Sequence, residues 1–391
     1  MLMDILIVED ARDQRMILSV VLKKQGHRVF EASDGYEALH VLESHPSIRI
    51  VISDWMMPNM DGIELCDVIR KSYIGRYVYF MLLTGKSDRQ AVVEGINRGA
   101  DDFINKPVDF DELGARLNAG VRIIELKAAL ENKIQTIEKD LESAAQMQAL
   151  LLAEPAKIQN VDFNWYFKPS RILGGDMFGY QALDSETLSF YQLDVAGHGI
   201  PSALFSFLLN NTLREGGGGA LVKDLLNEPP FYRIKDPDEV LVNLNEQFQA
   251  KPEAMLYFSI AYGIINSRTG SVTISQAGHP SPLWLKNSIR TVEKISRGGV
   301  PIGMMPGMTY ENVTIQLQPG DRLFLYSDGV TECENSSGEM FGEARLESLL
   351  VNLFDDSIKT MIRQVEADII KWTENDVFED DVTYLVLEWQ P

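Results

Sequence analysis

The chain has few cysteines, few basic residues for its acid content and no long apolar run. Only Cys66 and Cys333 are cysteines, and their separation excludes a disulfide framework and fits a reducing compartment. No apolar run approaches the roughly 20 residues of a membrane span, and Asp4 interrupts any apolar signal-peptide region. The sequence therefore predicts a cytoplasmic protein with no membrane partner.

Acidic residues outnumber basic ones in the chain as a whole. The 57 Asp and Glu against 36 Lys and Arg give a formal charge of -21. Such a molecule repels nucleic-acid backbones and anionic lipid surfaces, and no basic recognition helix follows the first domain. Direct DNA binding is therefore not expected. At roughly 150 residues per domain, 391 residues indicate two or three domains.

The first part of the chain alternates short apolar runs with amphipathic stretches. The runs that read as strands are 5–8, 28–31, 50–53, 78–83 and 102–104. Segments between them, such as 11–24 and 63–71, carry apolar residues at helical spacing. This alternation builds a parallel sheet with helices on both faces. Residues 1–122 are therefore predicted to be a doubly wound, flavodoxin-like α/β domain.

A long helix is expected next, because no proline and only Gly114 and Gly120 interrupt the roughly forty residues after Leu113 before Glu154-Pro155 ends it. Its apolar residues recur close to heptad spacing with one four-residue stutter, at Ile123, Leu126, Leu130, Ile134, Ile137, Leu141 and Ala144. Such a stripe packs either on the chain's own domains or in a parallel coiled coil, and the coiled coil is favoured. Residues 123–155 are predicted to be a helical linker that forms a homodimer.

The remaining residues, 156–391, contain many β-rich runs. They are 163–167, 187–193, 257–265, 271–275, 322–326 and 383–387. Helical stretches at 202–214 and 239–249 interrupt them. This pattern predicts an α+β domain with a β-sandwich core. The tract Gly216–Gly219 lacks a following Lys-Ser/Thr, so we interpret it as a flexible insertion rather than a phosphate-binding loop.

Charged side chains follow several predicted strands of the first domain. Glu9 and Asp10 follow the first strand, Asp54 the third, and Lys106 the fifth, while the hydroxyl of Thr84 follows the fourth. Ligands collect at the carboxyl ends of such strands. Converging carboxylates repel one another unless a cation lies between them, and oxygen ligands suit Mg²⁺. The pattern predicts phosphoryl transfer to a carboxylate.

These residues resemble the receiver domain of two-component response regulators over about residues 1–120. The matching stretches are Ile7–Asp10, Ser53–Gly62, Leu83–Gly85 and Asn105–Pro107. The resemblance implies that a sensor histidine kinase phosphorylates Asp54, while Glu9, Asp10 and the Met56 carbonyl help to hold Mg²⁺. It also implies a switch formed by Thr84, Phe103 and Lys106, with Phe103 standing where a tyrosine is often found.

A second set of acids lies beside glycines in the C-terminal part. The corners are Gly174-Gly175-Asp176, Asp194–Gly199, Ser327-Asp328-Gly329 and Glu379-Asp380-Asp381. Glycine lets the backbone approach a metal or phosphate closely. Acids without basic partners require cations, and the lack of His and Cys ligands favours Mg²⁺ or Mn²⁺ over Zn²⁺. Two ions about 3.5–4 Å apart could activate a water and clamp a phosphate monoester.

These corners resemble the PP2C class of metal-dependent serine/threonine phosphatases, in its bacterial SpoIIE-like branch, over about residues 140–391. Further matching pieces are Gln146–Leu152, Ala277–Pro282, Ser327–Glu332, Met340–Gly342 and Asp380–Thr383. The resemblance implies a two-metal site, with Mn²⁺ or Mg²⁺ held by Asp176, Asp194, Asp328 and Asp380. The Val195 carbonyl is a further candidate ligand, and Asp381 is a second choice.

Three positions depart from this family's pattern or invite another role. Gly179 stands where many relatives repeat an acid, so an outer metal contact is expected to be lost. His198 has the chemistry of a general acid near pH 7, but it does not match the position of the family's histidine, and a helix-entry or substrate-facing role is favoured. His279 is expected to shape a loop rather than to bind metal.

The order of receiver, helix and phosphatase predicts a response regulator whose output is a protein phosphatase. The resemblance implies a phosphorylated STAS-type anti-sigma-factor antagonist as substrate, and hence regulation of a sigma factor. The alternative is an RssB-like adaptor, which binds the stationary-phase sigma factor and delivers it for proteolysis. The intact acids favour the enzyme.

Overall fold

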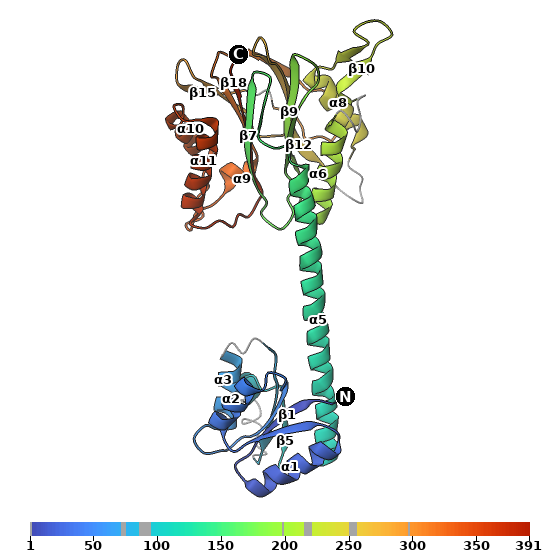
Figure 1. The fold of residues 1–391 in the computed structure, drawn as a ribbon, viewed down its shortest axis with the longest axis vertical. Coiled ribbons are helices and arrows are strands. Elements are labelled where there is room, and N and C mark those ends of the chain that lie inside the picture. The colour runs from blue at the N-terminus through green and yellow to red at the C-terminus, as the bar shows by residue number, and fades with distance from the viewer. Residues whose placement is uncertain are drawn as a thin grey trace. The chain divides into compact units, whose positions relative to one another are not determined.

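A computed structural model of the chain describes residues 2–71, 76–85, 95–197, 199–214, 221–249, 256–295 and 298–391 (Figure 1). It separates into two compact units, Met1–Glu138 and Lys139–Pro391. His198 and the tract Gly216–Gly219 lie outside the described residues. Within these ranges, none of the helices combines the length and apolarity needed to cross a membrane.

The N-terminal unit contains a five-stranded parallel sheet in the order β2-β1-β3-β4-β5. Its strands are β1 Asp4–Val8, β2 Arg28–Ala32, β3 Ile50–Asp54, β4 Tyr79–Thr84 and β5 Asp102–Asn105. The described helices that precede the long one are α1 Arg12–Lys24, α2 Gly35–Ser44 and α3 Gly62–Lys71. This arrangement confirms the predicted doubly wound fold.

Apolar side chains cover both faces of this sheet. On one face, Ala38 and Leu42 of α2 and Leu65 of α3 pack against the strands. On the other face, Leu22 of α1 and Leu117 of the following long helix do so. The central strand β3 is buried along its whole length, as expected for a parallel strand that is covered on both sides.

The long helix α5 runs from Phe110 to Leu151 and belongs to both units. The expected long helix is present, but it begins at Phe110, within the residues predicted for the first domain, and ends before the Glu154-Pro155 pair that we expected to terminate it. Leu113 and Leu117 anchor its first turns in the core of the N-terminal unit. Farther along, Leu126 and Leu130 of the predicted stripe are 71% and 60% exposed.

The C-terminal unit contains two antiparallel sheets packed face to face. One has five strands in the order β16-β13-β12-β9-β8, and the other six in the order β15-β14-β17-β18-β7-β6. Their bounds are β6 Ala156–Ile158, β7 Val161–Lys168, β8 Met177–Ala182, β9 Thr187–Val195, β12 Phe258–Asn266, β13 Ser271–Ala277, β14 Leu283–Lys286, β15 Thr291–Lys294, β16 Asn312–Gln316, β17 Arg322–Tyr326 and β18 Val382–Trp389. A separate hairpin joins β10 Lys223–Leu225 to β11 Tyr232–Ile234.

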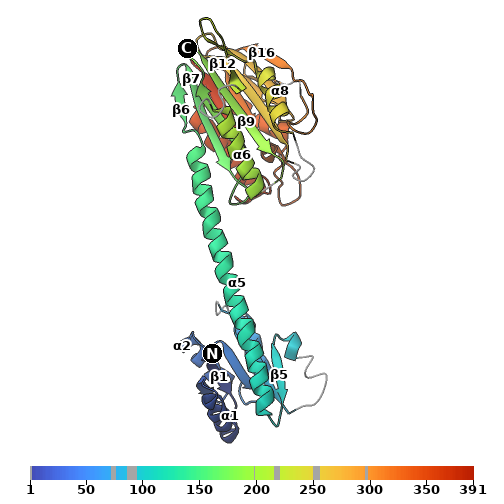
Figure 2. The ribbon, with the colours of Figure 1, turned by 90° about the vertical axis from the view of Figure 1, so that its right-hand side faces the viewer.

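Helices cover the outer face of each sheet (Figures 1 and 2). They are α6 Ile200–Leu213 and α8 Pro237–Gln247 on the five-stranded sheet, and α9 Asp328–Glu332, α10 Glu343–Asn352 and α11 Ile358–Thr373 on the six-stranded sheet. Between the sheets, Phe163, Phe190 and Leu385 belong to a shared apolar core. The predicted β-sandwich core is therefore confirmed, with helices added outside it.

Both cysteines are free thiols. Cys66 is buried on α3, and Cys333 is half-buried after α9. Burial raises the pKa of each thiol to about 11. Neither side chain is therefore ionised near neutral pH.

Candidate functional site

Carboxylates gather at the carboxyl ends of β1 and β3. Glu9 and Asp10 directly follow β1, and Asp54 is the last residue of β3. Each of the three offers an oxygen, and these oxygens all lie within 4.8 Å of one another. The structure thus brings together the predicted acidic triad. Among the described residues, no other group of three or more such side chains has its ligand atoms this close together.

Lys106 lies against two of these acids. Its Nζ is 2.7 Å from Glu9 Oε2 and 2.8 Å from Asp54 Oδ2. Burial alone would lower the pKa of Lys106, but its hydrogen bonds to Asp54 and Glu9 outweigh burial and raise that pKa. Burial raises the pKa of Glu9 despite the contact with Lys106. The lysine stays charged and offsets part of the negative charge of the triad.

Asp54 is held in place through its backbone and its carboxylate. The backbone N–H of Trp55 donates to Asp54 Oδ1 at 2.8 Å. Gly62 opens α3 so close to this strand that a Cβ on it would lie 2.1 Å from the Asp54 carbonyl oxygen. Glycine is therefore required where α3 meets the candidate phosphoacceptor.

The other predicted receiver residues lie around this edge. Thr84, the last residue of β4, is buried, and its carbonyl accepts the N–H of Lys106 at 2.7 Å. Phe103 of β5 is half-buried beneath the Arg116 guanidinium, whose carbon is 5.6 Å from the ring centre. The Met56 side chain is exposed. The switching role of Thr84 and Phe103 and the ligand role of the Met56 carbonyl stay predictions.

The second set of acids lies where the two sheets of the C-terminal unit end. Asp176 precedes β8 and Asp194 is the penultimate residue of β9, and the two strands pair through Met177 and Leu193. On the other sheet, Asp328 begins α9 just after β17, and Asp380 precedes β18. Each sheet therefore contributes two of the predicted ligands to the same end of the sandwich.

These acids disfavour one another's ionisation. Burial raises the pKa of Asp176 well above its usual value, and the charges of Asp194 and Asp381 add to the effect. Burial, with the charges of Asp328 and Asp380, raises the pKa of Asp194 to about 8. The pKa of Asp328 is raised by burial and by Asp380. The strongest charges acting on this set are other carboxylates, so a cation would relieve its repulsion.

The surroundings of one carboxylate oxygen indicate whether a metal ion fits among these acids. Asp176 Oδ2 is buried and has no partner in hydrogen-bond geometry among the described residues, while the nearby Thr383 and Ser327 side chains offset only part of the rise in the Asp176 pKa. Buried carboxylate oxygens without donors are costly unless an ion satisfies them. The Val195 carbonyl faces the same loop, since a Cβ on Gly175 would lie 3.1 Å from its oxygen. An all-oxygen donor set of this kind fits Mg²⁺ or Mn²⁺.

The carboxylate of Asp381 accepts more hydrogen bonds than that of its neighbour Asp380. Its Oδ1 accepts from the N–H and hydroxyl of Ser170 at 2.8 and 3.0 Å. Its Oδ2 accepts from the N–H of Gly175 at 2.6 Å and of Asp176 at 3.3 Å. Asp380 is exposed and accepts from the N–H of Asp381. Asp380 is therefore the more available ligand, whereas Asp381 fastens the Asp176 loop.

Gly179 and His279 have structural explanations. A Cβ on Gly179 would lie 2.6 Å from the hydroxyl of Tyr191, so an acid at this position would collide with that ring. His279 is buried, with Nδ1 2.8 Å from Ser259 Oγ, and burial lowers its pKa to about 3. A neutral, buried histidine agrees with the predicted loop-shaping role. Sequence reasoning missed Ser259, which pairs with Asp194 across β12 and β9.

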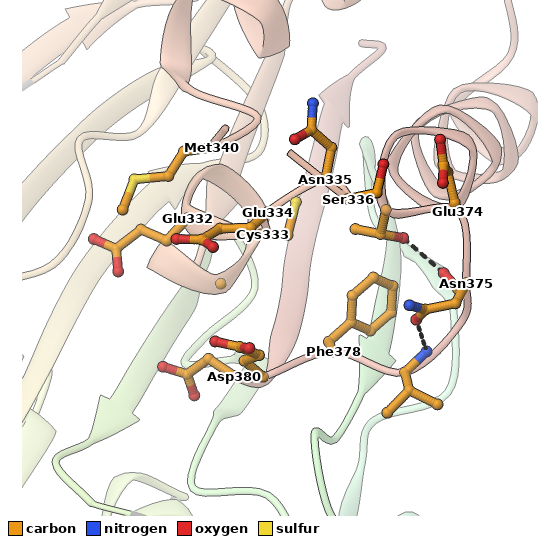
Figure 3. A pocket seen from close by; sticks show the side chains of 14 residues that line it. Glu332, Cys333, Glu334, Asn335, Ser336, Met340, Glu374, Asn375, Phe378 and Asp380 are labelled. Carbon is orange, nitrogen blue, oxygen red and sulfur yellow. Dashed lines mark hydrogen bonds between the residues drawn. The ribbon is translucent and has the colours of Figure 1, made fainter. Parts of the chain in front are cut away.

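A pocket of about 680 Å³ adjoins the acids on the side of the six-stranded sheet (Figure 3). Asp380 and Gly329 form part of its lining, together with Glu332 and Glu334. Figure 3 shows Glu332, Glu334 and Asp380 along the same side of the hollow. Neither lysine nor arginine occurs among its described lining residues. A phosphate group could approach this region only if cations neutralised the acids.

Two family models match the chain. The model for Stage II sporulation protein E, SpoIIE, matches residues 184–390, which is more than half of the chain. The model for the Response regulator receiver domain matches residues 5–118.

Individual proteins show the same two parts. Protein IcfG of Synechocystis sp. is 26% identical over 302 residues, covering 73% of this chain and 47% of that protein. Phosphoserine phosphatase RsbU of Bacillus subtilis is 25% identical over 254 residues, covering 65% of this chain and 71% of RsbU. The chain thus spans about half the length of IcfG. The structure of the SiaA-PP2C domain of Pseudomonas aeruginosa shares the fold, with a TM-score of 0.54 and 18% identity over 66% of this chain and 99% of that one.

Proposed function

Because the chain belongs to the SpoIIE family and carries a response regulator receiver domain, we propose that it is a metal-dependent protein serine/threonine phosphatase controlled by phosphorylation of Asp54. One observation carries the proposal. The acids at the end of the sandwich include a buried oxygen without a donor, Asp176 Oδ2, and carboxylates whose pKa values are raised by burial and by one another. Such a set of acids lowers the stability of the fold unless bound cations compensate its charge.

The phosphatase chemistry divides between the ions and the chain. Bound divalent ions would supply an activated water and neutralise the charge of the phosphate. Asp176, Asp194, Asp328 and Asp380 would hold them, with the Val195 carbonyl as a further ligand. Asp381 orients the Asp176 loop through the N–H groups of Gly175 and Asp176. The buried Gln192 amide donates to the Thr383 carbonyl at 2.9 Å, which ties β9 to β18 beneath these acids.

The receiver would accept a phosphoryl group from a sensor histidine kinase on Asp54. Glu9 and Asp10, with the Met56 carbonyl, would hold the Mg²⁺ that neutralises the transferred group. Lys106, already 2.8 Å from Asp54 Oδ2, would supply a further positive charge. Thr84 and Phe103 would change conformation when Asp54 is phosphorylated and so transmit the change to the rest of the domain. In this proposal residues 1–122 receive the signal, 123–155 transmit it and 156–391 carry out hydrolysis.

The proposed substrate is phosphoserine or phosphothreonine on a STAS-type anti-sigma-factor antagonist, which would place the protein in sigma-factor regulation. The name of its relative RsbU, a phosphoserine phosphatase, supports this choice of phosphoamino acid. An RssB-like adaptor would instead bind a sigma factor without needing hydrolysis. Pull-down of a sigma factor by the Asp176→Ala/Asp328→Ala variant distinguishes the two, because an adaptor would retain that binding.

The first test is phosphate release from a phosphorylated antagonist in Mn²⁺, with and without acetyl phosphate as a phosphoryl donor for Asp54. We expect the donor to change turnover of the wild type and to leave Asp54→Ala unaffected. Couplings of 1–3 kcal/mol between sites correspond to roughly 5–150-fold. Absence of release from both the antagonist and an aryl phosphate would contradict the enzyme. Equal response of wild type and Asp54→Ala would contradict the control by the receiver.

The exposed stripe of α5 supports a homodimer. Ile134 and Ile137 are exposed like Leu126 and Leu130, and a parallel second copy would bury this row. We expect Leu130→Glu to weaken self-association by roughly 100-fold or more, since burying one leucine in each chain is worth about 1.5–3 kcal/mol. Ala128→Glu adds the same charge on the opposite side of the helix and is the control. Sedimentation showing both variants equally dimeric, or a monomeric wild type, would contradict the dimer.

A further inference from the structure

The side chain of Gln148, near the end of α5, is buried although its helical neighbours are exposed. It is 2% exposed, whereas Gln146, Met147 and Ala149 face solvent. The nitrogen and the oxygen of its side-chain amide both form hydrogen bonds with the backbone of Gly174. Its Nε2 donates to the Gly174 carbonyl at 2.9 Å, and the Gly174 N–H donates to its Oε1 at 3.2 Å. Gln148 therefore satisfies both backbone polar groups of Gly174.

Gly174 opens the buried loop that leads to Asp176. The opposite side of this loop is held by Asp381, which accepts from the N–H groups of Gly175 and Asp176. A Cβ on Gly174 would lie 2.7 Å from Asp381 Oδ2, so the loop fits closely between the two side chains. The backbone that carries Asp176 is thus held from one side by Asp381 and from the other by Gln148.

Other contacts attach the end of α5 to the domain without touching this loop. The Trp165 indole donates to the Ala153 carbonyl at 2.7 Å. The Arg214 guanidinium donates to the Leu151 carbonyl at 3.2 Å. These bonds hold the helix end against β7 and α6. Loss of the Gln148 amide would therefore leave the helix docked and release chiefly the Gly174 loop.

We infer that Gln148 is a positioning residue for the metal ligand Asp176, acting through the backbone of Gly174. The inference rests on the proposed function, in which Asp176 holds a divalent cation. Groups that orient a ligand from behind typically change metal affinity by 10–100-fold when they are replaced. Because Gln148 belongs to α5, a rotation or shift of this helix would alter the same contact and thereby the order of the metal site.

The test compares Gln148→Met, which keeps the length of the side chain but removes both hydrogen bonds, with Gln146→Met on the exposed side of the same helix. Titration calorimetry of metal-free full-length protein with Mn²⁺ is expected to show binding weakened 10–100-fold in Gln148→Met and unchanged in Gln146→Met. Gln148→Glu retains an acceptor for the Gly174 N–H but places a buried carboxylate oxygen against the Gly174 carbonyl, so it is expected to weaken binding at least as much as Gln148→Met.

Hydrogen exchange of the metal-free proteins supplies a second measurement that does not depend on activity. Exchange at residues 174–176 is expected to accelerate at least tenfold in Gln148→Met, while β13 in the same domain keeps wild-type protection and reports that the domain is folded. Wild-type Mn²⁺ affinity in a folded Gln148→Met protein, or unaltered exchange at 174–176, would overturn the inference. Wild-type protein that binds Mn²⁺ but releases no phosphate would instead contradict the proposed function and leave the role of Gln148 standing.

Discussion

Asp194→Asn is expected to abolish phosphatase turnover while making the metal-free protein more stable at pH 8.5. The folded pKa of Asp194 is raised to about 8 by burial and neighbouring carboxylates, far above the value of the unfolded chain. A carboxyl group with a raised folded pKa contributes stability at low pH, and this contribution is lost as the pH rises through the folded pKa. At pH 8.5 the wild type must hold an ionised Asp194, whereas asparagine stays neutral.

The measurements are melting temperature without metal and phosphate release with Mn²⁺. Without metal, the melting temperature of the wild type should fall between pH 6 and 8.5, and that of Asp194→Asn should fall less. A gain of 1 kcal/mol corresponds to roughly 2–4 °C for a domain of this size. Loss of a metal ligand that supplies several kcal/mol of transition-state stabilisation lowers turnover by roughly 10³-fold. Mn²⁺ should stabilise the wild type more at pH 8.5 than at pH 6, and the variant little at either pH.

Asp184→Asn is a matched control in the same domain. There, burial would raise the pKa of the carboxyl, but hydrogen bonds from the N–H groups of Glu186 and Thr187 outweigh burial and lower it. The same substitution should thus bring no gain in stability at pH 8.5 and leave turnover within about twofold, since it lies outside the acid cluster. Turnover retained by Asp194→Asn would count against its assignment as a ligand.

Gly62→Ala is expected to destabilise the receiver and to slow phosphorylation of Asp54. The added Cβ would lie 2.1 Å from the Asp54 carbonyl oxygen and 3.0 Å from Leu82 Cδ2. A backbone oxygen cannot rotate away as a side chain can, so α3 and the end of β3 must separate. Overpacking of this kind costs typically 1–3 kcal/mol, or roughly 4–8 °C per kcal/mol in a domain of about 100 residues.

Calorimetry of the full chain and labelling of Asp54 by acetyl phosphate in Mg²⁺ would measure both effects. Gly114→Ala is the control, because its nearest atom would be Gln25 Nε2 at 3.6 Å, an ordinary contact. Gly114 lies inside α5, where alanine is favoured over glycine by about 0.8–1.0 kcal/mol. The two substitutions should thus shift the receiver transition in opposite directions. An unchanged melting temperature of the receiver in Gly62→Ala would contradict the prediction and show that the end of β3 moves aside at little cost in free energy.

The elements that the sequence predicted well have strong apolar patterns. The run Ile50–Ile52 identifies β3 because a parallel strand buried on both faces needs apolar residues at successive positions. The acids of the N-terminal unit were equally predictable, because Glu9, Asp10 and Asp54 lie at or directly after the ends of such strands. In contrast, α11 was missed, although Ile358, Met361, Ile362 and Val365 form a buried row at helical spacing and Ser357 accepts from Thr360 at its start. The three-residue strand β6 offers too short a pattern to recognise.

Within the site, the sequence could identify residue types but not the direction of their side chains. Asp380 and Asp381 are adjacent acids, and only the hydrogen bonds of the Asp381 carboxylate to Ser170 and Gly175 distinguish a structural acid from an available one. Gln148 belongs to a helix rich in polar residues, where glutamine usually faces solvent. Its contact with Gly174 joins positions that are 26 residues apart, and no local pattern predicts it.

The two thiols described above have a practical consequence for following movements of α5. Thiolates, not thiols, react with maleimides and methanethiosulfonates, and burial keeps both native sulfurs protonated at neutral pH, with pKa values of about 11. A cysteine introduced at an exposed position such as Glu131 would therefore carry a spin or fluorescent probe over a nearly silent native background. Distances between such probes on two copies could be recorded before and after acetyl phosphate is added, in the otherwise unaltered protein.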